Sequence, residues 1–281
     1  MRRRPPGCYA KSMDEPDGYA THGDVKLAYW DRGQGPRTVL LIMGVFHRAA
    51  FWRQRVIDAL AREFRVILFD NRGTGYSTKP AEEITAELWA GDALAVLDEV
   101  GVERCTIVGY SMGGRVLQQL MLDHPERVER AILLSAVVGG ELGVPPLQEA
   151  LASFVPDPSL DSRGQYRAGF VGMSAPGFVD RNPGALAEFL ELSVSKRTPI
   201  KTLMNQFSVV QSGVCDQLTH LDIPVLIIQG DADPLVRPGN ADVLARHLPA
   251  ASRVDLPGIG HMVTWEAPDE FLEAALPFLR A

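Results

Sequence analysis

The chain has 281 residues, of which 46% are hydrophobic and 22% are charged, an ordinary globular balance. Its formal net charge is −7, which argues against a nucleic-acid-binding protein. No apolar run is long enough to span a bilayer, and the basic opening "MRRRPP" lacks the apolar segment of a signal peptide. We therefore expect residues 1–17 to form a disordered tail and the protein to need no membrane partner.

The three cysteines, Cys8, Cys105 and Cys215, give no pattern that points to a metal or to disulfides. Their spacing fits neither a disulfide framework nor a zinc site. The simplest expectation is a reducing, cytoplasmic setting and no bound metal.

The predicted strands and helices alternate along most of the chain. Residues 18–35 alternate in polarity between turn signals, which predicts an antiparallel hairpin at a sheet edge. Continuous apolar runs at 38–44, 65–70, 105–110, 131–138 and 224–230 are typical of strands that are buried on both faces of a parallel sheet. The intervening segments 51–64 and 87–101 have helical periodicity. This order predicts an α/β fold, a mostly parallel twisted sheet with helices on both faces.

The rhythm of strands and helices breaks between residues 139 and 215. This region begins rich in Gly and Pro and then contains helical fragments such as 184–196. Because long structureless loops are uncommon in compact domains, we expect an inserted helical cap here. The core then comprises residues 18–138 and 216–281.

The stretch "VGYSMGG" carries the first candidate for chemistry. Ser111 follows the predicted strand 105–110 and precedes a helical segment, with Gly109 and Gly113 on either side. A sharp strand-to-helix turn exposes its apex residue and leaves no room for side chains two positions away. The pattern predicts that Ser111 is a nucleophile.

A serine hydroxyl needs an adjacent base, and the base needs an acid to orient it. Among six histidines, His261 follows a probable last strand and lies in a loop with glycines at 258 and 260. The loop after strand 224–230 offers two acids, Asp231 and Asp233, at the strand end where sites of this kind lie. The loop composition alone does not choose between them.

A serine nucleophile also requires donors for the negative charge that develops on the carbonyl oxygen. Two backbone N–H groups are candidates. Met112 follows the nucleophile at the start of a helix, and Val45 lies in the loop after strand 38–44. We further expect Phe46, Tyr110 and Phe207 to contact the substrate.

Taken together, these motifs resemble the α/β-hydrolase superfamily, in particular its bacterial esterase, haloperoxidase and lactonase-like branch. The resemblance rests on "LLIMGVF", "FDNRGTGYS", "VGYSMGG", "GDADPLVRPG" and "GIGHMVTWEAPDEF". It implies the order Ser111, Asp233, His261 for nucleophile, acid and base. It also implies that the N–H groups of Val45 and Met112 face one another and that no cofactor is needed. The chain departs from the usual His-Gly before the oxyanion residue, since it has Met43 there.

The resemblance predicts hydrolysis of a small-molecule carboxylic ester or lactone through an acyl-enzyme. Serine at the turn excludes the mechanism of relatives with an aspartate nucleophile. Two alternatives use the same residues. One is a tailoring hydrolase of secondary metabolism, such as a thioesterase or a C–C bond hydrolase. The other is a ligand receptor on the same scaffold with slow turnover.

Overall fold

The computed structural model describes residues 13–80, 84–196, 198 and 200–281. Eight strands form a single sheet in the spatial order β1-β2-β4-β3-β5-β6-β7-β8. The strands are β1 (Gly18–His22), β2 (Val25–Arg32), β3 (Thr38–Ile42), β4 (Arg65–Phe69), β5 (Cys105–Tyr110), β6 (Val128–Leu134), β7 (Val225–Gly230) and β8 (Ala251–Leu256).

Strands β3 to β8 run parallel, whereas β1 and β2 form an antiparallel hairpin whose second strand pairs antiparallel with β4. Every residue of β5 and β7 is buried, because helices cover both faces of the sheet there. The predicted α/β fold with an edge hairpin is confirmed.

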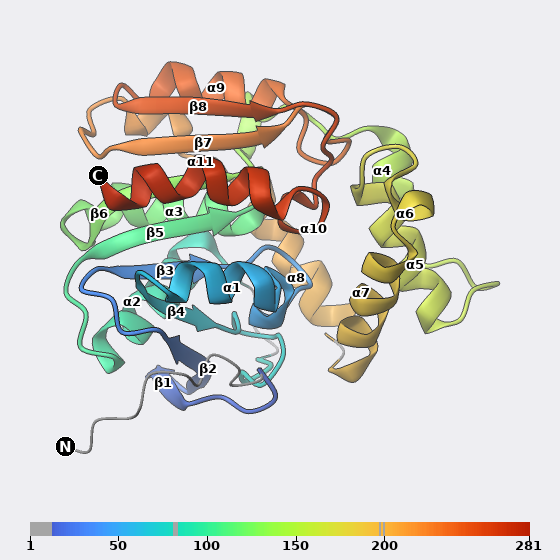
Figure 1. Ribbon diagram of the computed structural model, residues 1–281, viewed down its shortest axis with the longest axis horizontal. Coiled ribbons are helices and arrows are strands. Elements are labelled where there is room, and N and C mark those ends of the chain that lie inside the picture. The colour runs from blue at the N-terminus through green and yellow to red at the C-terminus, as the bar shows by residue number, and fades with distance from the viewer. Residues whose placement is uncertain (1–12, 81–83, 197, 199) are drawn as a thin grey trace.

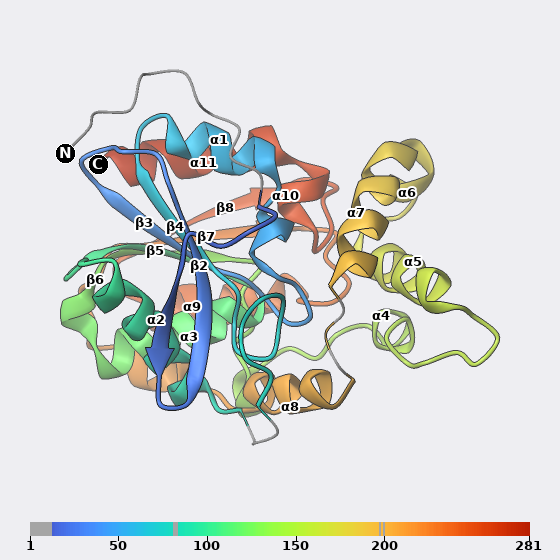
Figure 2. The ribbon, with the colours of Figure 1, turned by 90° about the horizontal axis from the view of Figure 1, so that it is seen from below.

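Helices lie on both faces of the sheet (Figure 2). One face is covered by α1 (Gln54–Ala61) and α11 (Pro268–Arg280), and the other by α2 (Ala86–Glu99), α3 (Met112–Asp123) and α9 (Gly239–His247). The four-residue α10 (Val263–Glu266) precedes α11. In the described part of the chain, no helix combines the length and apolarity that a membrane span requires.

The segment between β6 and β7 is helical. It contains α4 (Gln148–Ala152), α5 (Ser162–Met173), α6 (Phe178–Arg181), α7 (Pro183–Ser195) and α8 (Ile200–Gln211). Helices α4 to α7 lie beyond the end of the sheet toward which the arrows of β7 and β8 point (Figure 1). They therefore stand at the carboxyl edge of the parallel strands.

Two predicted elements end earlier than expected. The expected helix over 51–64 is divided into a 3-10 turn (Ala49–Trp52) and α1, because Arg53 between them has a φ of 59°. The expected strand over 131–138 is shifted to Val128–Leu134, and Ser135 leaves the strand with a φ of 42°. In both cases a residue in the left-handed region interrupts an apolar run.

Part of the predicted tail is ordered. Residues 1–12 lie outside the described residues, but 13–17 pack against β2. The indole Nε1 of Trp30 donates to the carbonyl oxygen of Glu15 at 2.8 Å, and Asp17 forms an ion pair with Arg32.

Candidate active site

Ser111 occupies the turn between β5 and α3. Its φ of 57° and ψ of −118° are strained for a residue with a side chain. The turn is held by the backbone: the Ser111 N–H donates to the carbonyl oxygen of Leu134 at 2.9 Å, and the Ser111 carbonyl oxygen accepts from the N–H of Val137 at 3.1 Å.

The glycines around this turn are needed because backbone passes directly over them. A Cβ at Gly109 would lie 2.5 Å from the carbonyl oxygen of Gly113. One at Gly113 would lie 2.3 Å from the carbonyl oxygen of Ile42 in β3. A Cβ at Gly44 would stand 3.0 Å from the Cβ of Ser111, so the loop after β3 runs beside the serine.

His261 joins Ser111 to Asp233 through both of its ring nitrogens. Its Nε2 lies 3.0 Å from Ser111 Oγ, and its Nδ1 lies 2.8 Å from Asp233 Oδ2. A carboxylate only accepts, so Nδ1 carries the proton and Nε2 is left to accept from the serine hydroxyl. The three side chains are nearly enclosed, with exposed fractions of 5%, 3% and 2% for Ser111, Asp233 and His261.

The structure separates the two candidate acids in the loop after β7. The second oxygen of Asp233 accepts from the N–H groups of Leu235 at 2.9 Å and Val236 at 2.8 Å, which fixes the carboxylate toward His261. Asp231 is exposed, and its Oδ1 accepts from the N–H of Gly258 at 2.6 Å. Asp233 is therefore the acid in contact with the histidine.

Tyr110 packs against the histidine. Its ring is stacked on the imidazole of His261 with centroids 5.2 Å apart, and its hydroxyl donates to the His261 carbonyl oxygen at 2.6 Å. Burial raises the pKa of Tyr110 well above its usual value, so the phenol stays protonated. We expected Tyr110 to contact substrate. Its side chain is buried against His261 and is not among the residues that line the cavity, so a contact with substrate stays a prediction.

The two expected N–H donors belong to segments that adjoin the serine. Met112 is the first residue of α3, and Val45 follows Gly44 in the loop that runs beside Ser111. Within the described residues, neither N–H donates to another protein group. Met43, at the position where the family usually has His, uses its carbonyl oxygen to accept from Asn71 Nδ2 at 2.8 Å, which fastens this loop to the end of β4.

Comparison with known proteins identifies the family of this chain. The family described as alpha/beta hydrolase fold matches residues 37–268, most of the chain. This chain belongs to the alpha/beta hydrolase family.

Similar proteins of this family are named as hydrolases of several kinds. This alpha/beta hydrolase is 27% identical to the 3-oxoadipate enol-lactonase 2 of Acinetobacter baylyi over 90% of this chain and 93% of that protein. It is also 27% identical to the 2-hydroxy-6-oxononadienedioate/2-hydroxy-6-oxononatrienedioate hydrolase of Burkholderia vietnamiensis, over 92% of each chain. A solved structure described as Est816, an N-acyl homoserine lactone degrading enzyme, is 29% identical. It has a TM-score of 0.78 over 92% of this chain and 99% of that one.

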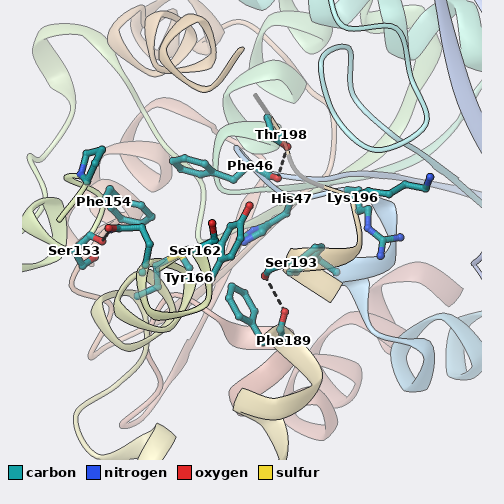
Figure 3. Close-up of a pocket in the computed structure, with 16 residues that line it drawn as sticks. Phe46, His47, Ser153, Phe154, Ser162, Tyr166, Phe189, Ser193, Lys196 and Thr198 are labelled. Atoms are coloured by element: carbon teal, nitrogen blue, oxygen red, sulfur yellow. Dashed lines mark hydrogen bonds between the residues drawn. The ribbon is translucent and has the colours of Figure 1, made fainter. Parts of the chain in front are cut away.

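A cavity of about 230 Å³ lies between the loop after β3 and the helices of the inserted segment. Its wall includes Phe46, Phe154 from the α4–α5 connection and Phe189 from α7 (Figure 3). Phe46, expected to contact substrate, stacks on Phe154 with centroids 5.3 Å apart. Phe207, also expected there, lies behind Phe46 with its ring edge-on at 5.5 Å and is not part of the wall.

Two further side chains position this site in the alpha/beta hydrolase and were missed in the sequence. Gln206 on α8 accepts from the N–H of Phe46 through Oε1 at 2.9 Å and holds that residue at a φ of 67°. Glu266 accepts from the N–H groups of Gly260, Met262 and Ala175 at 2.9–3.0 Å, so it ties the His261 loop to the end of α5. A glutamate five residues after His261 was visible in the sequence, but nothing marked Gln206.

The described residues hold no group of three His, Cys, Asp or Glu side chains arranged to bind a metal.

Proposed function

We propose that this protein hydrolyses a carboxylic ester or lactone through a covalent acyl-enzyme on Ser111. The observation that supports the proposal best is that His261 accepts a hydrogen bond from the Ser111 hydroxyl and donates one to Asp233. A serine beside a base that an acid orients is the arrangement that acyl transfer requires.

In the proposed mechanism, Ser111 Oγ attacks the carbonyl carbon of the substrate while His261 Nε2 takes the hydroxyl proton. Asp233 stabilises the imidazolium that forms. The N–H groups of Val45 and Met112 donate to the oxyanion of the tetrahedral intermediate. His261 then gives its proton to the leaving oxygen, and the acyl group remains on Ser111.

Water then releases the acyl group from Ser111, and His261 again acts first as a base and then as an acid. His261 Nε2 removes a proton from water, the hydroxide adds to the acyl carbon, and the collapsing intermediate releases the acid and returns the proton to Ser111 Oγ. For a lactone, the leaving oxygen stays attached to the acyl group, so the product is a hydroxy acid.

We further propose that residues 139–215 form a cap that decides which substrates reach Ser111. The supporting observations are the place of α4 to α7 at the carboxyl edge of the sheet and the aromatic cavity beneath them. A mostly apolar cavity next to a reactive group is the usual setting of a small-molecule site.

Labelling with a fluorophosphonate tests the role of the serine. We expect the label on the peptide that contains Ser111, and we expect Ser111→Ala to lose several orders of magnitude in ester turnover while its melting temperature is preserved. Label on another peptide, or full turnover by Ser111→Ala, would refute the acyl-enzyme. Steady release of p-nitrophenol after the burst separates an enzyme from a receptor that is acylated once.

A matched pair of substitutions tests the acid. Asp233→Asn should lower kcat by roughly 10⁴-fold, the order seen when the orienting acid of such a site becomes an amide. Asp231→Asn, in the same loop but without contact to His261, should stay close to wild type. The reverse ranking would assign the acid to Asp231.

A further inference from the structure

The cavity under the inserted helices does not include Ser111 among its lining residues, and the charges on its wall are of one sign. Of its sixteen lining residues, Arg48 and Lys196 are cationic and none is Asp or Glu, although the whole chain has a net charge of −7. His47 also lines the cavity, but burial and the nearby His261 lower its pKa to about 3, so its ring is neutral. The positive charge of the wall therefore comes from Arg48 and Lys196.

Arg48 is a buried cation without a counter-ion. Only 9% of its surface is exposed, and no carboxylate of the described residues lies within ion-pair distance of its guanidinium. Nη2 donates to Ser195 Oγ at 2.7 Å and to the carbonyl oxygen of Leu192 at 3.4 Å, while the buried Nε has no acceptor among the described residues. A buried charge in this state is costly unless something pairs with it.

Asp70, an acid that interacts electrostatically with Arg48, already accepts hydrogen bonds from other donors. Its Oδ1 accepts from the N–H of Ala49 at 2.7 Å and its Oδ2 from the N–H of Tyr76 at 2.8 Å. Both carboxylate oxygens of Asp70 thus bind backbone N–H groups in the segments after β3 and β4. The guanidinium Nε of Arg48 is left without an acceptor among the described residues.

Lys196 adds a second cation, and it directly follows Ser195, the hydrogen-bond partner of Arg48. Its Nζ lies 3.9 Å from the centroid of the Tyr76 ring. In Figure 3, Lys196 is on one side of the cavity and Ser153 and Phe154 are on the other, with His47 between them. The cavity therefore has cations on one part of its wall, and aromatic and small polar side chains line the rest.

This cavity adjoins the proposed active site at two places. Arg48 comes three residues after Val45, so their Cα atoms are at most about 10 Å apart. Met173 also lines the cavity, and its carbonyl oxygen accepts from the His261 N–H at 2.8 Å. The cavity thus borders both the loop that carries Val45 and the loop that carries His261.

We propose that the substrate carries a carboxylate beyond an apolar segment, and that Arg48 and Lys196 bind this carboxylate while the apolar segment lies against Phe46 and Phe189. The inference rests on the proposed ester or lactone hydrolysis and adds the substrate class. A carboxylate accepts from Arg48 Nε and so satisfies both the unpaired charge and the unpaired donor.

Paired substrates test the inference. The p-nitrophenyl half-esters of glutarate to suberate carry the terminal carboxylate, and the same esters with a terminal carboxamide lack the charge. ω-Acetoxyalkanoates and their amides make the same comparison with the charge on the alcohol side. We expect wild-type kcat/KM to favour the charged member of at least one series by about tenfold or more, the scale of a charge-assisted hydrogen bond. Equal kcat/KM for charged and neutral members of both series would overturn the inference.

Substitutions assign the preference to residues. Arg48→Met should bring the charged-to-neutral ratio toward one, and Lys196→Met, at an exposed position that tolerates the change, should lower it in part. Arg167→Met is the matched control, because it removes an exposed cation from α5 that does not line the cavity, and it should keep the wild-type ratio. If Arg48→Met slows both substrates equally and lowers the melting temperature, Arg48 only holds α7 and the inference is wrong.

A binding measurement separates this inference from the proposed function. Calorimetric titration of Ser111→Ala with suberate requires no turnover. Binding that Arg48→Met abolishes in the Ser111→Ala background supports the carboxylate site even if every ester fails as a substrate. No binding, together with steady hydrolysis of neutral esters, would leave the proposed hydrolase and refute the carboxylate site.

Discussion

Acidification should destabilise this protein through His47, because its imidazole is buried in its neutral form. The ring stacks on Phe51 with centroids 4.3 Å apart and meets the ring of Phe189 edge-on at 5.6 Å. Burial, and secondarily the charge of His261, lower the pKa of His47 to about 3. A proton on this ring would place a charge among aromatic side chains.

The size of the effect follows from the pKa of His47 in the folded and unfolded states. In the unfolded chain the pKa is about 6.5, so the unfolded state takes up a proton first as the pH falls. Stability is therefore full above about pH 6.5 and decreases as the pH falls toward about 3, where the folded state would also be protonated. At about pH 5 the loss from this one group is about 2 kcal/mol.

Urea unfolding of wild type and His47→Phe at about pH 7.5 and about pH 5 measures this loss. The phenyl ring keeps the stack on Phe51 and cannot be protonated. We expect the fall in free energy of unfolding between the two pH values to be smaller by about 2 kcal/mol in His47→Phe, since the other titrating groups are common to both proteins.

An exposed histidine provides the control for this measurement. His220→Phe, at an exposed position, should show the same fall in free energy of unfolding as wild type. If His47→Phe loses as much stability on acidification as wild type, His47 is already solvated or charged in the folded protein, and the argument from burial fails.

Three further substitutions test how the site is held. Gly113→Ala places a Cβ 2.3 Å from a carbonyl oxygen of β3 and should lower both the melting temperature and fluorophosphonate labelling, whereas Gly184→Ala, with open space around it, should do neither. Gln206→Met removes the acceptor of the Phe46 N–H and should lower ester kcat about tenfold, the cost of leaving a buried donor unsatisfied. Gln206→Glu keeps an acceptor and should lose less activity. Equal losses in the two variants would contradict this role of Gln206. Glu266→Gln turns an amide toward backbone N–H groups, so kcat on a neutral ester should fall about tenfold with little change in KM. An unchanged kcat would show that the His261 loop does not need the Glu266 carboxylate.

The sheet was predictable because its signal is local. Each parallel strand is an unbroken apolar run, since it is covered on both faces, and this pattern is contained within a few residues. The turn at Ser111 was predictable for a related reason. The close approach of backbone requires glycine at positions 109 and 113, and these two glycines are visible in the sequence next to Ser111.

The remaining features depend on contacts that are distant in the chain. Gln206 is 160 residues from its partner Phe46, and nothing near either residue reports the hydrogen bond. Tyr110 adjoins Ser111 in sequence, but its side chain alternates to the opposite side and meets His261, 151 residues away. The break at Arg53 reflects a left-handed residue within an apolar pattern that otherwise predicts a continuous helix.

The junction between α5 and the His261 loop has a consequence for engineering new specificities. The His261 N–H donates to the backbone carbonyl of Met173, Glu266 accepts from the backbone N–H of Ala175, and a Cβ at Gly260 would lie 2.2 Å from that same nitrogen. Each group that residues 173–175 contribute to these hydrogen bonds belongs to the main chain, whereas their side chains are buried in the packing around them. A segment transplanted from a relative should therefore support a correctly oriented His261, provided that the graft retains the backbone path through residues 173–175 and keeps side chains there that fit the same buried space.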